Sequence, residues 1–174
     1  VVEGVMGLYD GRYATADEGS TSELAKLLEA PVLLVVDSSK GARSIAAIVK
    51  GYHDFDPGLN LAGVILNGIG SIGHLEICRD AIEHYTCVPV VGYLPRRDDL
   101  VLPERHLGLI PTAEDPIQQE FLDTLITQCV ETLDISHILE LAESAGLPEP
   151  VRRLFPESPV GPAIRLGVAR DRSF

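Results

Sequence analysis

Two carboxylates, Glu3 and Asp10, flank a glycine-rich stretch near the start of the sequence, EGVMGLYDG. In an extended chain they would lie up to about 23 Å apart, so they can serve one ion or one phosphate only if the loop folds back. Gly4, Gly7 and Gly11 allow the backbone conformations that such a fold requires. Carboxylates commonly bind Mg²⁺ together with substrate phosphates. The stretch is therefore a candidate ion or phosphate site, and the alternative is an ordinary acidic surface turn.

Asp37 and Asn67 each follow an apolar run of strand length, VLLVV and GVIL. Asp37 could belong to a nucleotide or metal pocket, or it could cap the helix that follows. The amide of Asn67 can donate to and accept from the N6 and N7 edge of an adenine. Asn67-Gly68 is equally a common turn dipeptide. On residue types alone, both alternatives stay open at each position.

A basic cluster stands out in an acidic chain, because Arg96, Arg97 and Arg105 fall close together in a sequence with a formal charge of −12. Guanidinium groups bind phosphates and carboxylates in bidentate fashion, so the cluster suits ATP or a polycarboxylate substrate. The alternative is a solvated basic loop that pairs with its own acids. Those acids are Asp98, Asp99 and Glu104.

The elements that must position these residues alternate between strand and helix. Continuous apolar runs predict strands at 32–37, 61–67 and 88–94, and Val1-Val2 resembles the end of a buried strand with Glu3 at its carboxyl end. Amphipathic spacing predicts helices from a Ser20 or Thr21 cap to Ala30-Pro31, at 42–53 and at 75–85. This order predicts an α/β fold with a doubly wound, mostly parallel sheet. Ligand sites in such sheets lie at the carboxyl ends of the strands.

The second part of the chain differs in character. Helices are expected at 117–133 and, capped by Asp134, through Ala145. Residues 147–162 contain five prolines and read as a linker, and 164–171 as a new strand. Because Val1 enters in the middle of an apolar run, we expect an interior segment of a longer polypeptide.

Composition limits the function classes. The acidic charge argues against nucleic acid or an anionic membrane as a partner. No apolar run reaches the length of a membrane span, and no signal peptide is evident. The three cysteines suit reduced thiols in a cytoplasmic protein, with Cys87 expected as a small core residue. Four of the five histidines show no metal-binding spacing and are interpreted as structural; they are His53, His74, His84 and His137.

The stretches EGVMGLYDG and LPRRDDLVLPERHLGL resemble signatures of the cobyrinic acid a,c-diamide synthase family, which are glutamine-dependent corrinoid amidoligases. The resemblance runs from residue 1 to about residue 110 and resumes weakly at 164–174. It implies an ATP domain of the P-loop NTPase or dethiobiotin synthetase type, incomplete at its N-terminus, over 1–110. A helical segment and linker would occupy 111–163, and 164–174 would begin a glutaminase domain. Neither a GxxxxGK[ST] loop nor a CGG-like cysteine setting is present in the sequence.

The resemblance implies ATP- and glutamine-dependent amidation of the a and c carboxylates of cobyrinate through an acyl phosphate, a step of cobalamin biosynthesis. Glu3 and Asp10 would bind Mg²⁺, and Asp10 would alternatively orient the substrate carboxylate or the ammonia. Nucleotide contacts are implied for Asn67, Pro95 and Arg96. Substrate contacts are implied for Tyr9, Arg97, Arg105 and His106.

Two alternatives accompany this interpretation. The same architecture serves other tetrapyrroles, such as Ni-sirohydrochlorin and hydrogenobyrinate. From a different class, related folds act as partition-type ATPases, although the acidic charge disfavours that hypothesis. The partners expected are ATP, glutamine-derived ammonia, a corrinoid polycarboxylate and a second copy of the chain. Because the sequence contains no phosphate-binding loop, residues 1–174 alone are expected to be inactive.

Overall fold

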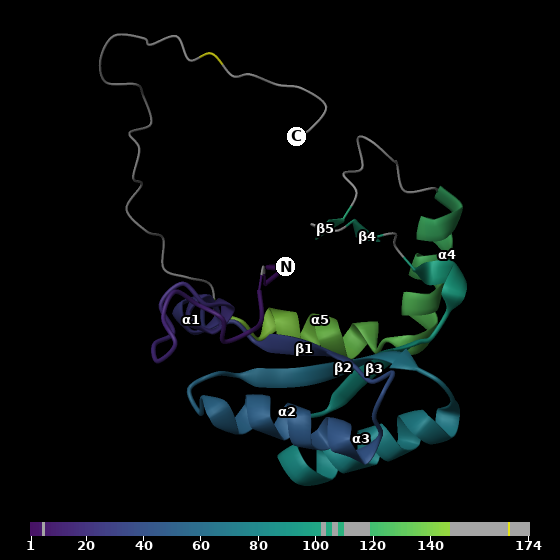
Figure 1. Cartoon of the computed structure of the whole chain (residues 1–174), viewed down its shortest axis with the longest axis horizontal. Coiled ribbons are helices and arrows are strands. Elements are labelled where there is room, and N and C mark those ends of the chain that lie inside the picture. The colour runs from purple at the N-terminus through teal and green to yellow at the C-terminus, as the bar shows by residue number, and fades with distance from the viewer. Residues whose placement is uncertain (5, 102–103, 106–107, 110–118, 147–166, 168–174) are drawn as a thin grey trace.

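The computed structural model describes residues 1–4, 6–101, 104–105, 108–109, 119–146 and 167. Its centre is a parallel sheet of three strands in the order β1 (Val32–Asp37), β2 (Leu61–Ile69) and β3 (Val90–Pro95) (Figure 1). Parallel strands need crossover connections, and helices supply both of them.

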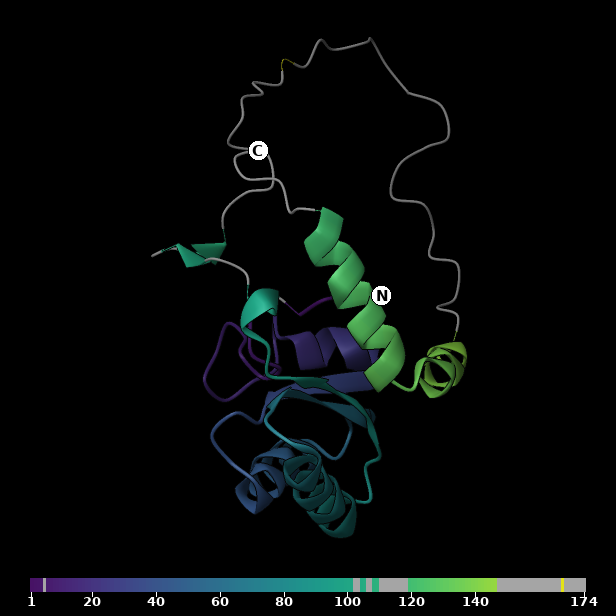
Figure 2. The ribbon, with the colours of Figure 1, turned by 90° about the vertical axis from the view of Figure 1, so that its right-hand side faces the viewer.

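The crossover helices α2 (Arg43–Phe55) and α3 (Ile72–Thr86) cover one face of the sheet. Their apolar sides pack with β2 into a core whose most buried members include Val49, Val64, Leu66, Cys78 and Ile82. Helices α4 (Gln119–Thr132) and α5 (Ile135–Glu143) lie on the opposite side of the sheet (Figure 2). The predicted α/β fold with helices on both faces of a parallel sheet is confirmed.

The corner between α4 and α5 is fixed to β3 at Gly92. Leu133 forms a β-bridge with Gly92, and the Asp134 N–H donates to the Val91 carbonyl oxygen at 2.8 Å. Gly92 has a φ of +155°, and a Cβ there would lie 2.7 Å from the Leu133 Cα. Only glycine therefore allows the corner to approach this closely. The Asp134 side chain caps α5, as predicted, by accepting from the His137 N–H.

The smaller elements are α1 (Thr21–Leu27), the short helix η1 (Asp98–Leu100) and an antiparallel pair of β4 (Glu104–Arg105) with β5 (Gly108–Leu109). Ser20 caps α1 by accepting from the Glu23 N–H, which confirms the predicted start of that helix. The helices and strands predicted at residues 20–95 all occur, with ends shifted by a few residues.

Two expectations are wrong. Val1 and Val2 form no strand and are exposed, because within the described part of the chain no strand pairs with them and no helix covers them. Cys87 is an exposed residue at the C-terminal end of α3, with a left-handed φ of +58°, and so lies outside the core. The predicted linker at 147–162, the strand at 164–171 and His106 lie outside the described residues, and the domain boundaries stay predictions. No helix in the described ranges has both the length and the apolar character needed to cross a membrane.

Candidate active site at the carboxyl edge of the sheet

The carboxyl ends of the three strands bring predicted site residues to one edge of the sheet. Asn67 on β2 is the register partner of Asp37 on β1 and of Leu94 on β3. Both Asp37 and Asn67 are exposed, and the Asn67 amide makes no hydrogen bond to any residue that the structure describes. Among the described residues, the amide donor and acceptor of Asn67 are thus both unused, at the position where open parallel sheets bind ligands.

Backbone contacts hold the loop after β1 against the end of β2. The N–H of the buried Ser38 donates to the Asn67 carbonyl oxygen at 2.8 Å. Gly68 has a φ of +74°, and a Cβ there would lie 3.1 Å from the Ser39 Cβ and 3.3 Å from the Asp37 Oδ1. The absence of a side chain at Gly68 therefore lets the two loops meet beside Asn67.

The Asp37 carboxylate is held locally. Its Oδ1 accepts from the Ser39 N–H at 2.9 Å, and the Ser39 hydroxyl and N–H lower the pKa of the Asp37 carboxyl. The alternative role as cap of the next helix is wrong, since α2 starts at Arg43 with Ala42 at its N-terminal boundary. Asp37 therefore contributes a fixed negative charge to the edge.

The basic stretch after β3 divides into two parts. Pro95 ends β3 as the register partner of Ile69, and the Arg96 N–H donates to the Ile69 carbonyl oxygen at 2.9 Å. These bonds place Pro95 and the exposed Arg96 at the same edge as Asn67. Arg96 is thus a guanidinium available to an anionic ligand.

Arg97 is paired within the chain. Its guanidinium donates to both carboxylate oxygens of Asp99, at 2.9 and 2.5 Å, and to the Gln128 Oε1 at 3.1 Å. The Asp99 carboxylate raises the pKa of Arg97. This is the arrangement of the alternative hypothesis, in which the basic loop pairs with its own acids. Arg105 lies in β4, and nothing of its side chain is described.

An open groove of about 490 Å³ lies beside Arg97 along α4. Apart from Arg97, its charged lining residues are all acidic: Glu120, Asp123 and Glu131. This field repels a polycarboxylate, so the groove does not favour a corrinoid contact at Arg97.

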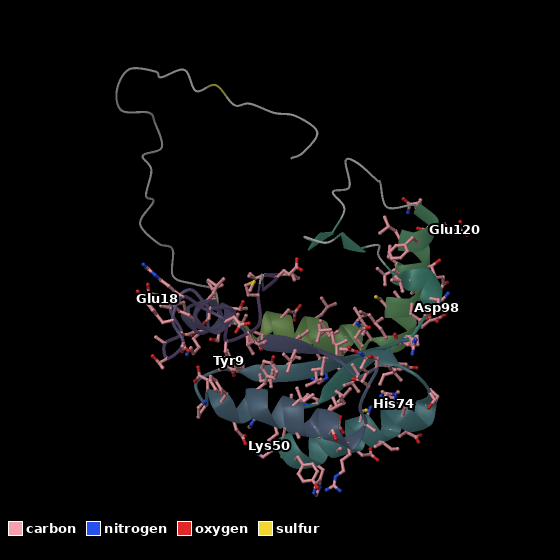
Figure 3. All side chains as sticks on the ribbon, in the orientation of Figure 1. Tyr9, Glu18, Lys50, His74, Asp98 and Glu120 are labelled. Carbon is pink, nitrogen blue, oxygen red and sulfur yellow. The ribbon has the colours of Figure 1, made fainter. Side chains whose placement is uncertain are left out.

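Tyr9 lies at the other end of the sheet. Its hydroxyl donates to the Tyr52 carbonyl oxygen at 2.6 Å, and its ring lies 4.6 Å from that of Phe55, measured between centroids. Tyr52 and Phe55 belong to the end of α2, which runs back to the amino ends of the strands. Figure 3 shows Tyr9 at one end of the sheet, and His74 and Asp98 at the other.

The stretch with Glu3 and Asp10 turns at residues 7–10, where the Asp10 N–H donates to the Gly7 carbonyl oxygen at 3.0 Å, and a second turn follows it. The Arg12 N–H donates to the Glu18 carbonyl oxygen at 2.8 Å, and a Cβ on Gly11 would lie 2.6 Å from that oxygen. Glu3 and Asp10 are exposed, and neither forms an ion pair within the described ranges. Since Asp10 follows Tyr9, it lies away from Asn67. Among the described residues, no three potential ligands are grouped as a metal site would need.

The structure therefore brings together Asp37, Asn67, Pro95 and Arg96, and keeps Tyr9 and Asp10 apart from them. Sequence reasoning missed two residues at this edge, Ser38 and His74. A serine after a strand has no distinctive signal, and a lone histidine on a helix is usually structural. In addition, Ser38 contacts Asn67 and His74 contacts Gly41, and both partners lie far away in the sequence, so no local pattern indicates these contacts.

Comparison with known proteins identifies the family of the chain. The AAA domain family matches residues 1–104, more than half of the chain. A cobyrinate a,c-diamide synthase from Dehalococcoides mccartyi strain CBDB1 is 54% identical over 176 residues, covering 100% of this chain and 38% of the relative. Proteins of the same name from Priestia megaterium and Salmonella typhimurium strain LT2 are 44% and 41% identical over 174 residues.

The similarity extends beyond the two stretches expected from the sequence, because these matches also include residues 111–163. The chain spans 38% of the length of the Dehalococcoides relative and 37% of that of the Priestia protein. No solved structure matches the chain. The parallel sheet, its crossover helices and the match over residues 1–104 show that this chain belongs to the AAA domain family.

Proposed function

We propose that this chain contributes the nucleotide-binding edge of an enzyme that amidates the a and c side-chain carboxylates of cobyrinate, with ATP and glutamine as co-substrates. The name shared by its relatives supports this reaction, as does an identity of 54% over the whole chain. The reaction belongs to cobalamin biosynthesis and is that of a carbon–nitrogen ligase.

The observation that carries the proposal is the exposed Asn67 at the carboxyl end of the central strand. Its amide is free within the described residues, and the loops on both sides are tied to the strand by backbone bonds. An amide carried on a backbone held in this way suits recognition of the N6 and N7 edge of adenine. Arg96 at the same edge supplies positive charge for the phosphates in an otherwise acidic protein.

The proposed reaction has two steps. An oxygen of the corrinoid carboxylate attacks the γ-phosphorus of ATP, the bond to the β–γ bridging oxygen breaks, and ADP leaves. Ammonia, released from glutamine, then attacks the carbonyl carbon of the acyl phosphate, loses a proton and displaces phosphate. Positioning of the two substrates and neutralisation of charge supply most of the catalysis in phosphoryl transfer. In this chain, Asn67 would orient the nucleotide and Arg96 would neutralise phosphate charge.

Mg²⁺ is part of the proposal, since ATP-dependent phosphoryl transfer usually requires it. Glu3 and Asp10 have the right donor chemistry, because both are exposed carboxylates that no described cation neutralises. When bound, the ion would neutralise charge on the phosphates. The described arrangement keeps Asp10 at the opposite end of the sheet from Asn67.

The proposal is tested by incubating the full-length protein with ATP, Mg²⁺, glutamine and cobyrinate, and measuring the corrinoid product by mass spectrometry together with ADP. We expect the a,c-diamide, with one ADP for each amide formed. Amidation of Ni-sirohydrochlorin or hydrogenobyrinate in place of cobyrinate would contradict the substrate. ATP hydrolysis without any amide would contradict the reaction and favour a partition-type ATPase.

A further inference from the structure

We propose that His74 is a positioning residue that clamps together the two loops beside Asn67 and so sets the affinity for ATP; this inference rests on the proposed function. His74 lies in the first turn of α3, at the carboxyl edge of the sheet (Figure 3). Its ring is half-buried, and both ring nitrogens contact the backbone. None of the residue patterns in the sequence indicated such a role.

The two contacts fix the tautomer of the imidazole. The Gly70 N–H donates to Nδ1 at 3.2 Å, so Nδ1 carries no proton. The Nε2 nitrogen therefore carries the proton and donates to the Gly41 carbonyl oxygen at 2.5 Å. A neutral imidazole is fully satisfied in this position, with one donor and one acceptor used.

The two partners belong to different loops of the site. Gly41 lies in the loop after β1, which begins at Asp37, and Gly70 lies in the loop after β2, which begins beyond Asn67. The Ser38 N–H bond to the Asn67 carbonyl oxygen joins the loop after β1 to the end of β2. His74 joins the loop after β1 to the segment after β2 a second time, farther along the chain. Asn67 is thus on a segment that is held at two points.

The base of the clamp is itself rigid. The Ser71 hydroxyl caps α3 by accepting from the His74 N–H at 3.2 Å, so the backbone of His74 is fixed to the start of the helix. The sulfur of the buried Cys78, one turn along α3, contacts the Ala42 carbonyl oxygen at 3.6 Å. Two side chains of α3, His74 and Cys78, therefore contact the loop before α2 at the neighbouring carbonyl groups of Gly41 and Ala42.

Loss of this clamp would let the loop after β1 move relative to Asn67. To pair with an adenine edge, the Asn67 amide must adopt one orientation. If the loop becomes ordered only when ATP binds, the entropy cost of ordering it lowers the affinity. A cost of re-ordering the loop on binding that equals the net worth of one ordinary hydrogen bond corresponds to a loss of about fivefold to tenfold in ATP affinity. None of the residues with implied substrate contacts lies in these two loops; those residues are Tyr9, Arg97, Arg105 and His106.

The test compares four variants of the full-length protein with the wild type. His74→Ala removes both contacts, His74→Gln places an amide donor where the Nε2 proton was, and His74→Asn places an acceptor where Nδ1 was. The control is His84→Ala, because His84 is an exposed histidine on the same helix whose ring lies edge-on to that of its neighbour Tyr85. The measurements are the Kd for ATP by calorimetry and the KM for cobyrinate.

We expect His74→Ala to weaken ATP binding about fivefold to tenfold with an unchanged KM for cobyrinate. His74→Gln should recover most of the affinity, because it keeps the contact between the two loops, and His74→Asn should recover less. His84→Ala should match the wild type.

Unchanged ATP affinity in His74→Ala would overturn the inference and leave the proposed function intact. An equal rise in the KM for cobyrinate, or equal loss in His84→Ala, would also overturn it, because either result indicates general destabilisation. If His74→Ala does not fold, His74→Gln and His74→Asn decide, and equal affinities for those two variants would refute the clamp. A wild-type protein that binds no ATP would instead refute the proposed function.

Discussion

Substitution of Gly68 by alanine tests the geometry of the candidate site directly. Gly68 has a φ of +74°, in the left-handed region, where an L-residue with a Cβ is strained by about 1 kcal/mol or more. The added Cβ would also lie 3.1 Å from the Ser39 Cβ and 3.3 Å from the Asp37 Oδ1, so the loop after β1 must shift. Together these effects predict a loss of about 1–3 kcal/mol in the free energy of unfolding.

Gly51→Ala is the matched control. Gly51 lies in the interior of α2, and nothing lies within 4 Å of a Cβ built there. The same change should therefore stabilise the protein by about 0.5–1 kcal/mol through helix propensity. Urea unfolding of residues 1–174, followed by circular dichroism, measures both variants. In the full-length protein, Gly68→Ala should also weaken ATP binding, since the shifted loop adjoins Asn67. Equal stability and equal ATP affinity in the two variants would refute the reasoning about this edge.

Four further predictions concern residues at both ends of the sheet. Asn67→Ala should weaken ATP binding while leaving cobyrinate binding unchanged, and separate titrations of the full-length protein check this. Glu3→Gln should abolish amidation without changing the circular dichroism spectrum, because it removes a charge proposed for Mg²⁺; normal turnover would contradict that role. Tyr9→Phe should lose about 0.5–1.5 kcal/mol of stability with the hydrogen bond to Tyr52, and keep its ATP affinity, which a nucleotide titration tests. Folding lowers the pKa of Asp37 from 3.8, so its stabilising effect is complete above about pH 5 and is lost as the pH falls through the folded pKa. Asp37→Asn should therefore reduce the loss of stability at acid pH, which urea unfolding at several pH values measures.

The fold was largely predictable, because the apolar runs that become β1, β2 and β3 are continuous and the helices between them are amphipathic. The position of Asn67 at a strand end followed from the same runs. The location of Tyr9 did not, because its partners Tyr52 and Phe55 are more than forty residues away in the sequence. A strand at Val1-Val2 was expected from two apolar residues, and a run of that length does not specify its environment.

The pairing of Arg97 illustrates a second limit. Its proximity to Asp99 in the sequence made the ion pair one of two open alternatives, and the structure shows that pair. The contact to Gln128 comes from α4 and depends on how that helix crosses the sheet. The clamp by His74 is of the same kind, since Gly41 precedes it by 33 residues. Contacts made across helices and loops carry no local pattern.

The most direct test of the account is the response of Asn67 to the nucleotide. With selective ¹⁵N labelling of asparagine, the side-chain amide resonance of Asn67, assigned through Asn67→Ala, can be followed while ATP is added to the full-length protein. We expect this resonance to shift with ATP and to shift less with GTP, because the purine edge differs, while Tyr9→Phe leaves the response unchanged. An Asn67 resonance that does not move at saturating ATP would contradict the nucleotide-binding edge.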